Sequence, residues 1–229
     1  MKILIIGEDN RYFPLREKLQ KNPNLEIERS DGDEDEDFEE YDVIFDLHFD
    51  DEPSNFEIYT GLKNKYIFLN TVKTSINEVV YSHDVKIKSF LFGINALPTF
   101  IEQAVWEMVL YRKFEMPQLE KIAKELGVDF EVIEDRVGMV KPKVLFMIIN
   151  EACFTLQEGT ATIEDIDTSM KLGTNYPFGP FEWCDKIGIT NVFETLAAVY
   201  EDTKDKRYKI CPLLKTKYLR NETFYKTVK

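Results

Sequence analysis

The sequence predicts an α/β domain with a mostly parallel sheet, followed by an all-helical domain. In the first half of the chain, short apolar runs alternate with amphipathic segments of helical period, which is the pattern of β-α-β units. Beyond Gly138 the apolar residues follow the helical period almost throughout. The chain has 229 residues and is 44% hydrophobic, so it can bury a sizeable core. The change of pattern near residue 136 predicts domains at residues 1–135 and 136–229.

The α/β domain is expected to begin with a strand and a helix separated by Gly7. The strand candidates are residues 2–6, 25–28, 41–47, 66–69, 88–94 and 130–133. The helix candidates are residues 11–21, 56–65, 76–81 and 118–126. Asn22-Pro23 is expected to end the first of these helices and Gly127 the last. Residues 31–37 are nearly all acidic, and their mutual repulsion predicts a solvated loop.

The helical domain is expected to have one central helix. Residues 144–156 are apolar on most sides, which is typical of a buried helix. Thr162 and Asp165 begin the next helix in the manner of a capping box, and Gly173 ends it. Residues 176–180 are rich in Pro and Gly and predict a turn. Further helices are expected at residues 181–187 and 191–200.

The composition limits the classes of function. The chain carries 29 Lys and Arg against 42 Asp and Glu, a balance that argues against binding to nucleic acid or to an anionic membrane. No apolar run approaches the roughly 20 residues of a spanning helix. The apolar start is too short for a signal peptide, so we expect a cytoplasmic protein. Neither a disulfide framework nor a metal site is predicted from the few residues that could form one, Cys153, Cys184, Cys211, His48 and His83.

An ordered series of short motifs follows Gly138. The motifs are Asn150-Glu151-Ala152, Glu158-Gly159, and residues 164–167, 170–173 and 176–182, with Asp185 and Gly188 after them. In these motifs the chain resembles the C-terminal domain of the L-3-hydroxyacyl-CoA dehydrogenases, over about residues 115–229. The first half resembles that family in outline only, through residues 69–71 and 92–98. The resemblance implies a Rossmann-like N-terminal domain, truncated here because only residues 30–40 replace a long helical excursion.

The resemblance also implies a cofactor loop of the pattern G-x-G-x-x-G after the first strand. The first glycine is present as Gly7, whereas Asp9 and Tyr12 stand at the second and third glycine positions. A side chain at the second position blocks the close approach of a pyrophosphate, and Glu8 and Asp9 would repel it. Candidates for the acid that the family places on the adenosine ribose are Glu28 and Asp31. We therefore expect no NAD cofactor unless the site has been rebuilt.

The family's catalytic residues can be compared position by position. The resemblance implies a histidine base, a glutamate that orients it, a serine and an asparagine that contact the substrate. An ungapped count places Phe92, Ala104, Val72 and Pro142, in that order, at these positions. Glu102 would replace the glutamate only if the following strand slipped by two residues. The sequence therefore predicts no catalytic residue at any of the four positions.

Neither histidine is a strong candidate for a catalytic residue in place of those that are missing. His48 follows a strand at its carboxyl end, where α/β sheets bind ligands, but a histidine flanked by acids is also common on surfaces. Ser82-His83-Asp84 is consecutive, whereas a catalytic triad is defined by spatial roles, so it predicts a turn.

Three hypotheses of function remain open. The first is a catalytically degenerate member of the 3-hydroxyacyl-CoA dehydrogenase family, with a binding or accessory role in fatty-acid metabolism and an acyl-CoA-like ligand. The second is an active NAD-dependent dehydrogenase with a rebuilt site, and the third is a scaffold or interaction module. The missing residues favour the first, because hydride transfer needs a bound nicotinamide and a base near the hydroxyl.

We further expect a homodimer. The family's C-terminal domain pairs two subunits, and residues 144–156 are more apolar than a small helical domain should bury alone. The null hypothesis is that the N-terminal domain covers these helices.

Overall fold

The structure, a computed structural model, describes residues 1–30 and 36–225. It divides into two compact units, Met1–Met139 and Val140–Lys229. The sequence-based boundary lay between residues 135 and 136, a few residues before this division. Most of the acidic run, residues 31–35, lies outside the described residues.

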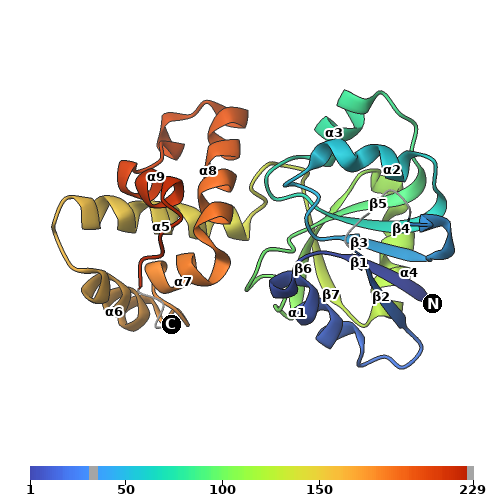
Figure 1. The fold of residues 1–229 in the computed structure, drawn as a ribbon, viewed down its shortest axis with the longest axis horizontal. Helices are drawn as coiled ribbons and strands as arrows, with labels where there is room; N and C mark the ends of the chain where they lie inside the picture. Colours follow the sequence, from blue (N-terminus) through green and yellow to red (C-terminus); the bar gives the residue numbers. More distant parts are fainter. Residues whose placement is uncertain (31–35, 226–229) are drawn as a thin grey trace. The chain divides into compact units, whose positions relative to one another are not determined.

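The described part of the first unit contains a seven-stranded sheet with the order β2-β1-β3-β4-β5-β6-β7 (Figure 1). The strands are β1 (Lys2–Ile6), β2 (Glu26–Ser30), β3 (Val43–Asp46), β4 (Lys63–Asn70), β5 (Lys88–Ile94), β6 (Val105–Leu110) and β7 (Asp129–Ile133). Every neighbouring pair is parallel except β5 and β6. The predicted α/β class with a mostly parallel sheet is confirmed.

The helices of this unit connect the strands. They are α1 (Asp9–Leu19), α2 (Glu57–Thr60), α3 (Ile76–His83) and α4 (Met116–Leu126). The helices α1 and α4 pack on one hydrophobic cluster that includes Ile3, Ile5 and Leu15. Alternate residues of β1 point to this face, as the pleat of a strand requires.

One sequence prediction in this unit was wrong, and one strand was missed. The helix expected over residues 56–65 is a short turn of 3-10 helix, Pro53–Phe56, followed by α2, which ends before Gly61. The remainder belongs to β4, where Lys63 pairs with Lys88 of β5, so strand pairing overrides local helix propensity. The strand β6 was not predicted, and its residues run antiparallel to β5.

The second unit is helical. Its described helices are α5 (Lys141–Gln157), α6 (Ile163–Thr174), α7 (Pro180–Ile187), α8 (Ile189–Thr203) and α9 (Pro212–Leu219). The helix α5 supplies buried core residues such as Phe146, Ile149 and Cys153. The prediction of an all-helical second domain is confirmed. No helix among the described residues is both long enough and apolar enough to cross a membrane.

The turn before α7 is fixed by a buried carboxylate. Asp167 of α6 accepts hydrogen bonds from the backbone N–H groups of Phe181 and Glu182, at 2.9 and 3.0 Å. The Tyr225 hydroxyl donates to the same carboxylate at 2.9 Å. Gly179 lies so close that an added Cβ would be 2.2 Å from Asp167 Cγ. The Pro- and Gly-rich motif therefore has a structural role, which is to seat α7 against α6.

Candidate functional site

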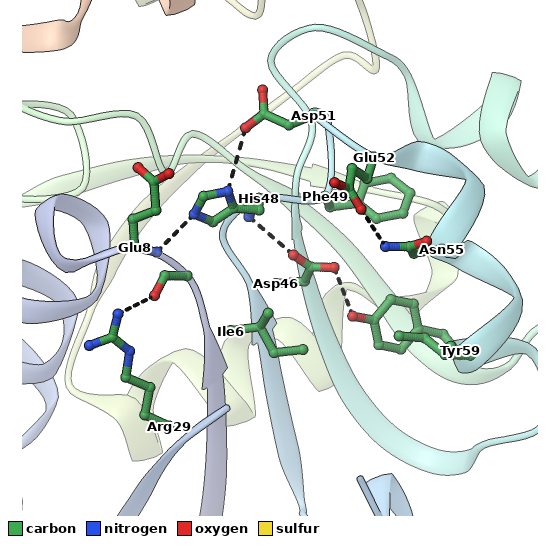
Figure 2. A pocket seen from close by; sticks show the side chains of 12 residues that line it. Ile6, Glu8, Arg29, Asp46, His48, Phe49, Asp51, Glu52, Asn55 and Tyr59 are labelled. Carbon is green, nitrogen blue, oxygen red and sulfur yellow. Dashed lines mark hydrogen bonds and ion pairs between the residues drawn. The ribbon is translucent and has the colours of Figure 1, made fainter. Parts of the chain in front are cut away.

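A pocket lies at the carboxyl ends of β1 and β3 (Figure 2). The chain proceeds from β1 to β2 on one side and then to β3 on the other, so the strand order reverses between β1 and β3. Such a reversal is where open α/β sheets bind ligands. The pocket has a volume of about 260 Å³, and we call it the switch-point pocket. It is the candidate site of this unit.

The first wall of the switch-point pocket is the turn between β1 and α1. The backbone N–H of Glu8, which caps α1, donates to Nε2 of His48 at 2.8 Å. Gly7 is tightly packed, because an added Cβ would lie 3.0 Å from Cβ of Leu47. Gly7 therefore permits a close contact between the segments that follow β1 and β3.

Arg29, which lines the pocket, contacts both Asp9 and Tyr12 of α1. Arg29 of β2 forms an ion pair of 2.7 Å with Asp9 and donates to the carbonyl of Gly7 at 2.9 Å. The same guanidinium lies 4.6 Å from the ring centroid of Tyr12, a buried residue of α1. Side chains thus occupy the two positions at which the resemblance implies the second and third glycines of a cofactor loop.

These residues do not fit a dinucleotide pyrophosphate. A pyrophosphate binds to a helix N-terminus through free backbone N–H groups and a loop without side chains. Here the Glu8 N–H is bonded to His48, and Asp9 and Tyr12 hold Arg29 across the turn. The acidic side chains of Glu8 and Asp9 add repulsion for an anion.

Glu28, one of the two candidates for the ribose acid, is engaged by other residues. Glu28 accepts a hydrogen bond from the Tyr41 hydroxyl at 2.8 Å and pairs with Lys2 at 3.3 Å. Its pKa is lowered, first by the bond from Tyr41. Asp31 lies outside the described residues.

A buried carboxylate forms the floor of the switch-point pocket (Figure 2). Asp46, the last residue of β3, is 6% exposed. It accepts hydrogen bonds from the Tyr59 hydroxyl at 2.8 Å and from the His48 backbone N–H at 3.1 Å. Burial raises the pKa of Asp46 to about 6, against the opposing effect of these two bonds. Burial and the neighbouring Asp46 also raise the pKa of Tyr59.

His48 is a neutral hydrogen-bond acceptor. Because Nε2 accepts from Glu8, the proton of the neutral ring belongs on Nδ1, which faces the Asp51 carboxylate at 3.7 Å. Burial and then the Arg11 guanidinium lower the pKa of His48. From the sequence, His48 could be either a surface residue or part of a ligand site. In the structure it lines the switch-point pocket.

A second carboxylate ties the ends of three strands together. The buried Asp50 accepts from Asn70 Nδ2 at 2.6 Å and from the backbone N–H groups of Val72 and Lys73, both at 3.0 Å. Asn70 in turn accepts from the Ala96 N–H at 2.8 Å. Burial raises the pKa of Asp50 to about 6. Sequence reasoning missed Asp50, although its place just after a buried strand was a usable signal.

The four catalytic positions of the resemblance have different surroundings. Phe92 is fully buried and lies in an aromatic series, with its ring 5.2 Å from that of Phe68. Val72 is buried beside Asp50, and Pro142 is buried in the first turn of α5. Ala104 is exposed and precedes β6. None of these side chains can exchange a proton.

The strand β6 carries a buried acid that the ungapped count did not find. Glu107 is 5% exposed and lies in the middle of β6, three residues after Ala104. Glu102, the other candidate, is exposed and precedes the strand. An insertion before β6 would explain why counting alone stopped short of Glu107.

His83 and the cysteines do not form a second catalytic or metal site among the described residues. His83 ends α3, and its Nδ1 lies 2.8 Å from the carbonyl of Val79, so Ser82-His83-Asp84 is a helix end. The three cysteines are buried and free. Among the described residues there is no group of three or more His, Cys, Asp or Glu that could hold a metal ion.

Comparison with known proteins identifies relatives of both units. Residues 138–229 match the family model described as 3-hydroxyacyl-CoA dehydrogenase, C-terminal domain. A 3-hydroxybutyryl-CoA dehydrogenase of Bradyrhizobium diazoefficiens is 40% identical over 95 residues, which are 42% of this chain and 32% of that protein. The 3-hydroxybutyryl-CoA dehydrogenase of Clostridioides difficile is 27% identical over 201 residues, 84% of this chain and 70% of that protein. With the first of these relatives, the match spans only about a third of the relative's length.

A solved structure resembles the whole chain in fold. The crystal structure of (S)-3-hydroxybutyryl-CoA dehydrogenase from Ralstonia eutropha covers 100% of this chain and 99% of its own, with a TM-score of 0.75. The sequence identity is 19%, so this likeness concerns the fold alone.

Proposed function

Because residues 138–229 place this chain in the 3-hydroxyacyl-CoA dehydrogenase family, we propose that it is a member without dehydrogenase activity, with a binding or accessory role. The observation that carries the proposal is the filled cofactor loop, where Arg29 joins Asp9 and Tyr12. A hydride acceptor needs a nicotinamide held against the substrate, and this loop is the family's means of holding it.

The second support is the absence of a base. Phe92 stands where the family's histidine base is expected, and it is packed in the core without a titratable group. General-base catalysis needs a proton acceptor within hydrogen-bond reach of the substrate hydroxyl. Glu107 is the one observation that favours the alternative of a rebuilt site, because it is a buried acid on the strand where the orienting glutamate is expected.

The proposal includes the expected partners. An acyl-CoA-like molecule is the candidate ligand, and a homodimer through the helical domain is the candidate assembly. Both follow from the family resemblance and are open to direct measurement.

Calorimetry and an activity assay test this function. We expect no heat on titration with NADH and no NAD reduction with 3-hydroxybutyryl-CoA. A thermal-shift series with CoA and acyl-CoA esters should reveal a ligand of the accessory role, because a bound ligand raises the melting temperature by mass action. Micromolar affinity for NADH, together with turnover that is lost on Glu107→Gln or His48→Ala, would establish the rebuilt site instead.

A further inference from the structure

The charge of the switch-point pocket differs from that of an anion site. Its lining includes the four carboxylates Glu8, Asp46, Asp51 and Glu52 against one guanidinium, that of Arg29. Of the four, Asp51 is paired with Arg11 at 3.4 Å and with Lys73, and these cations do not line the pocket. The polar lining therefore presents an excess of acceptors and of negative charge.

The donors at the pocket are engaged by the chain itself. The Glu8 N–H is bonded to His48, and Arg29 is bonded to Asp9 and to the Gly7 carbonyl. An anion would compete with these contacts, whereas a cation would not.

Asp46 is a buried acceptor on the pocket floor. It is nine-tenths buried and lines the pocket. The Arg11 guanidinium lowers its pKa from a distance, but Arg11 pairs with Asp51 and donates to the Leu47 carbonyl, and no ion pair to Asp46 is found among the described residues. A carboxylate has about four lone-pair positions, and here Tyr59 and the His48 N–H use two of them. Two hydrogen bonds and one more distant guanidinium offset only part of the cost of burying this carboxylate, so a cation bound in the pocket would stabilise it further.

The rest of the pocket sets the size and shape of such a ligand. A volume of about 260 Å³ lies just below the range of pockets for drug-sized molecules. Ile6, Phe49 and Ile58 give the lining an apolar side next to the carboxylates. Glu8 and Glu52 are exposed at the rim, where they would attract a positive charge.

We propose that the switch-point pocket binds a small organic cation, a guanidinium or primary ammonium group on a short apolar chain. The cationic head hydrogen-bonds to Asp46, and the chain lies against Ile6 and Phe49. This inference rests on the proposed function, because a dinucleotide would occupy the same end of the sheet.

A matched pair of probes tests the charge preference. Butylguanidinium and butylurea have nearly the same shape, but only the first is charged. In calorimetry on the full chain at neutral pH and low salt, we expect binding of butylguanidinium and none of butylurea. Asp46→Asn should weaken the binding by about tenfold, since the negative charge that strengthens the hydrogen bond to the cationic head is lost.

A second variant, at the exposed residue Glu8, tests the same site in case the Asp46 variant does not fold. Glu8→Gln keeps the backbone bond to His48 and removes one exposed charge, so we expect binding to weaken by about threefold. Glu120→Gln, an exposed carboxylate on α4 away from the pocket, is the matched control and should bind like the unchanged chain.

The outcomes separate this inference from the proposed function. Equal binding of both probes, or no effect of Asp46→Asn and Glu8→Gln, would overturn the cation site. If neither probe binds and NADH does not bind either, the cation site is wrong while the loss of dehydrogenase function stands. If NADH binds and displaces butylguanidinium, the proposed function fails.

Discussion

The backbone N–H of Glu8 donates to Nε2 of His48 at 2.8 Å, which joins the start of α1 to the end of β3. The first N–H groups of a helix have no partner within the helix and are the groups that bind phosphates in dinucleotide folds. One donor at this terminus is therefore satisfied by the chain's own imidazole. The contact also requires that the imidazole be neutral, because a protonated Nε2 cannot accept.

This contact predicts a dependence of stability on pH. The pKa of His48 is lowered in the folded state from an ordinary value of 6.5, so the folded chain binds fewer protons than the unfolded chain below that pH. The stabilisation is therefore fully present above pH 6.5 and is lost as the pH falls through the folded-state pKa. We expect His48→Ala to cost about 1 kcal/mol at pH 7.5 and less at pH 5 in urea unfolding. Equal costs at both pH values would contradict the assignment.

Removing Asp50 should be among the most damaging single changes in the first unit. Asp50→Ala leaves Asn70 Nδ2 and the N–H groups of Val72 and Lys73 without their acceptor. We expect a loss of about 3 to 5 kcal/mol in the free energy of unfolding. Glu52→Ala, an exposed carboxylate two residues away, should change it by less than about 0.5 kcal/mol. Similar losses in the two variants would show that the Asp50 network does not hold the strand ends together.

Two glycines of the helical unit should respond in opposite directions to alanine. At Gly179 the new Cβ would meet Asp167 Cγ at 2.2 Å, and that carboxylate is held by Phe181 and Glu182. Gly179→Ala should therefore cost about 1 to 3 kcal/mol. Gly173 lies within α6 with nothing within 4 Å of the added atom, so Gly173→Ala should stabilise by about 0.5 to 1 kcal/mol. Chemical unfolding of the full chain measures both, and opposite signs are required.

The molar mass of the protein in solution, measured by light scattering, tests the expected homodimer. Val140, which caps α5, and Val144 in its first turns are exposed at 53% and 59%. An interface through this unit would bury such residues, so light scattering should give twice 26.9 kDa. Val144→Lys should shift the mass toward the monomer, whereas Glu201→Gln on α8 should not. A mass of 26.9 kDa that stays constant with concentration would mean that the chain is a monomer.

The sequence by itself determined the class of fold and the identity of the altered loop. Apolar runs and helical periods depend on neighbours in the chain, so they located β1, β3, β5 and α5 closely. Gly7, Asp9 and Tyr12 occupy fixed positions after the first strand, and their side chains could be compared with the family's glycines without a structure.

Only the tertiary structure decided how the pocket is built. His48 and Glu8 are 40 residues apart, and they meet because parallel pairing aligns the carboxyl ends of β1 and β3. The same alignment brings Asp50 to the ends of β4 and β5, and the pairing of β5 with β6 locates Glu107 within the strand. Asp46 is buried at the end of β3, where it accepts from the hydroxyl of Tyr59, 13 residues further along the chain. Local sequence patterns carry none of these long-range pairings, which are set by strand register.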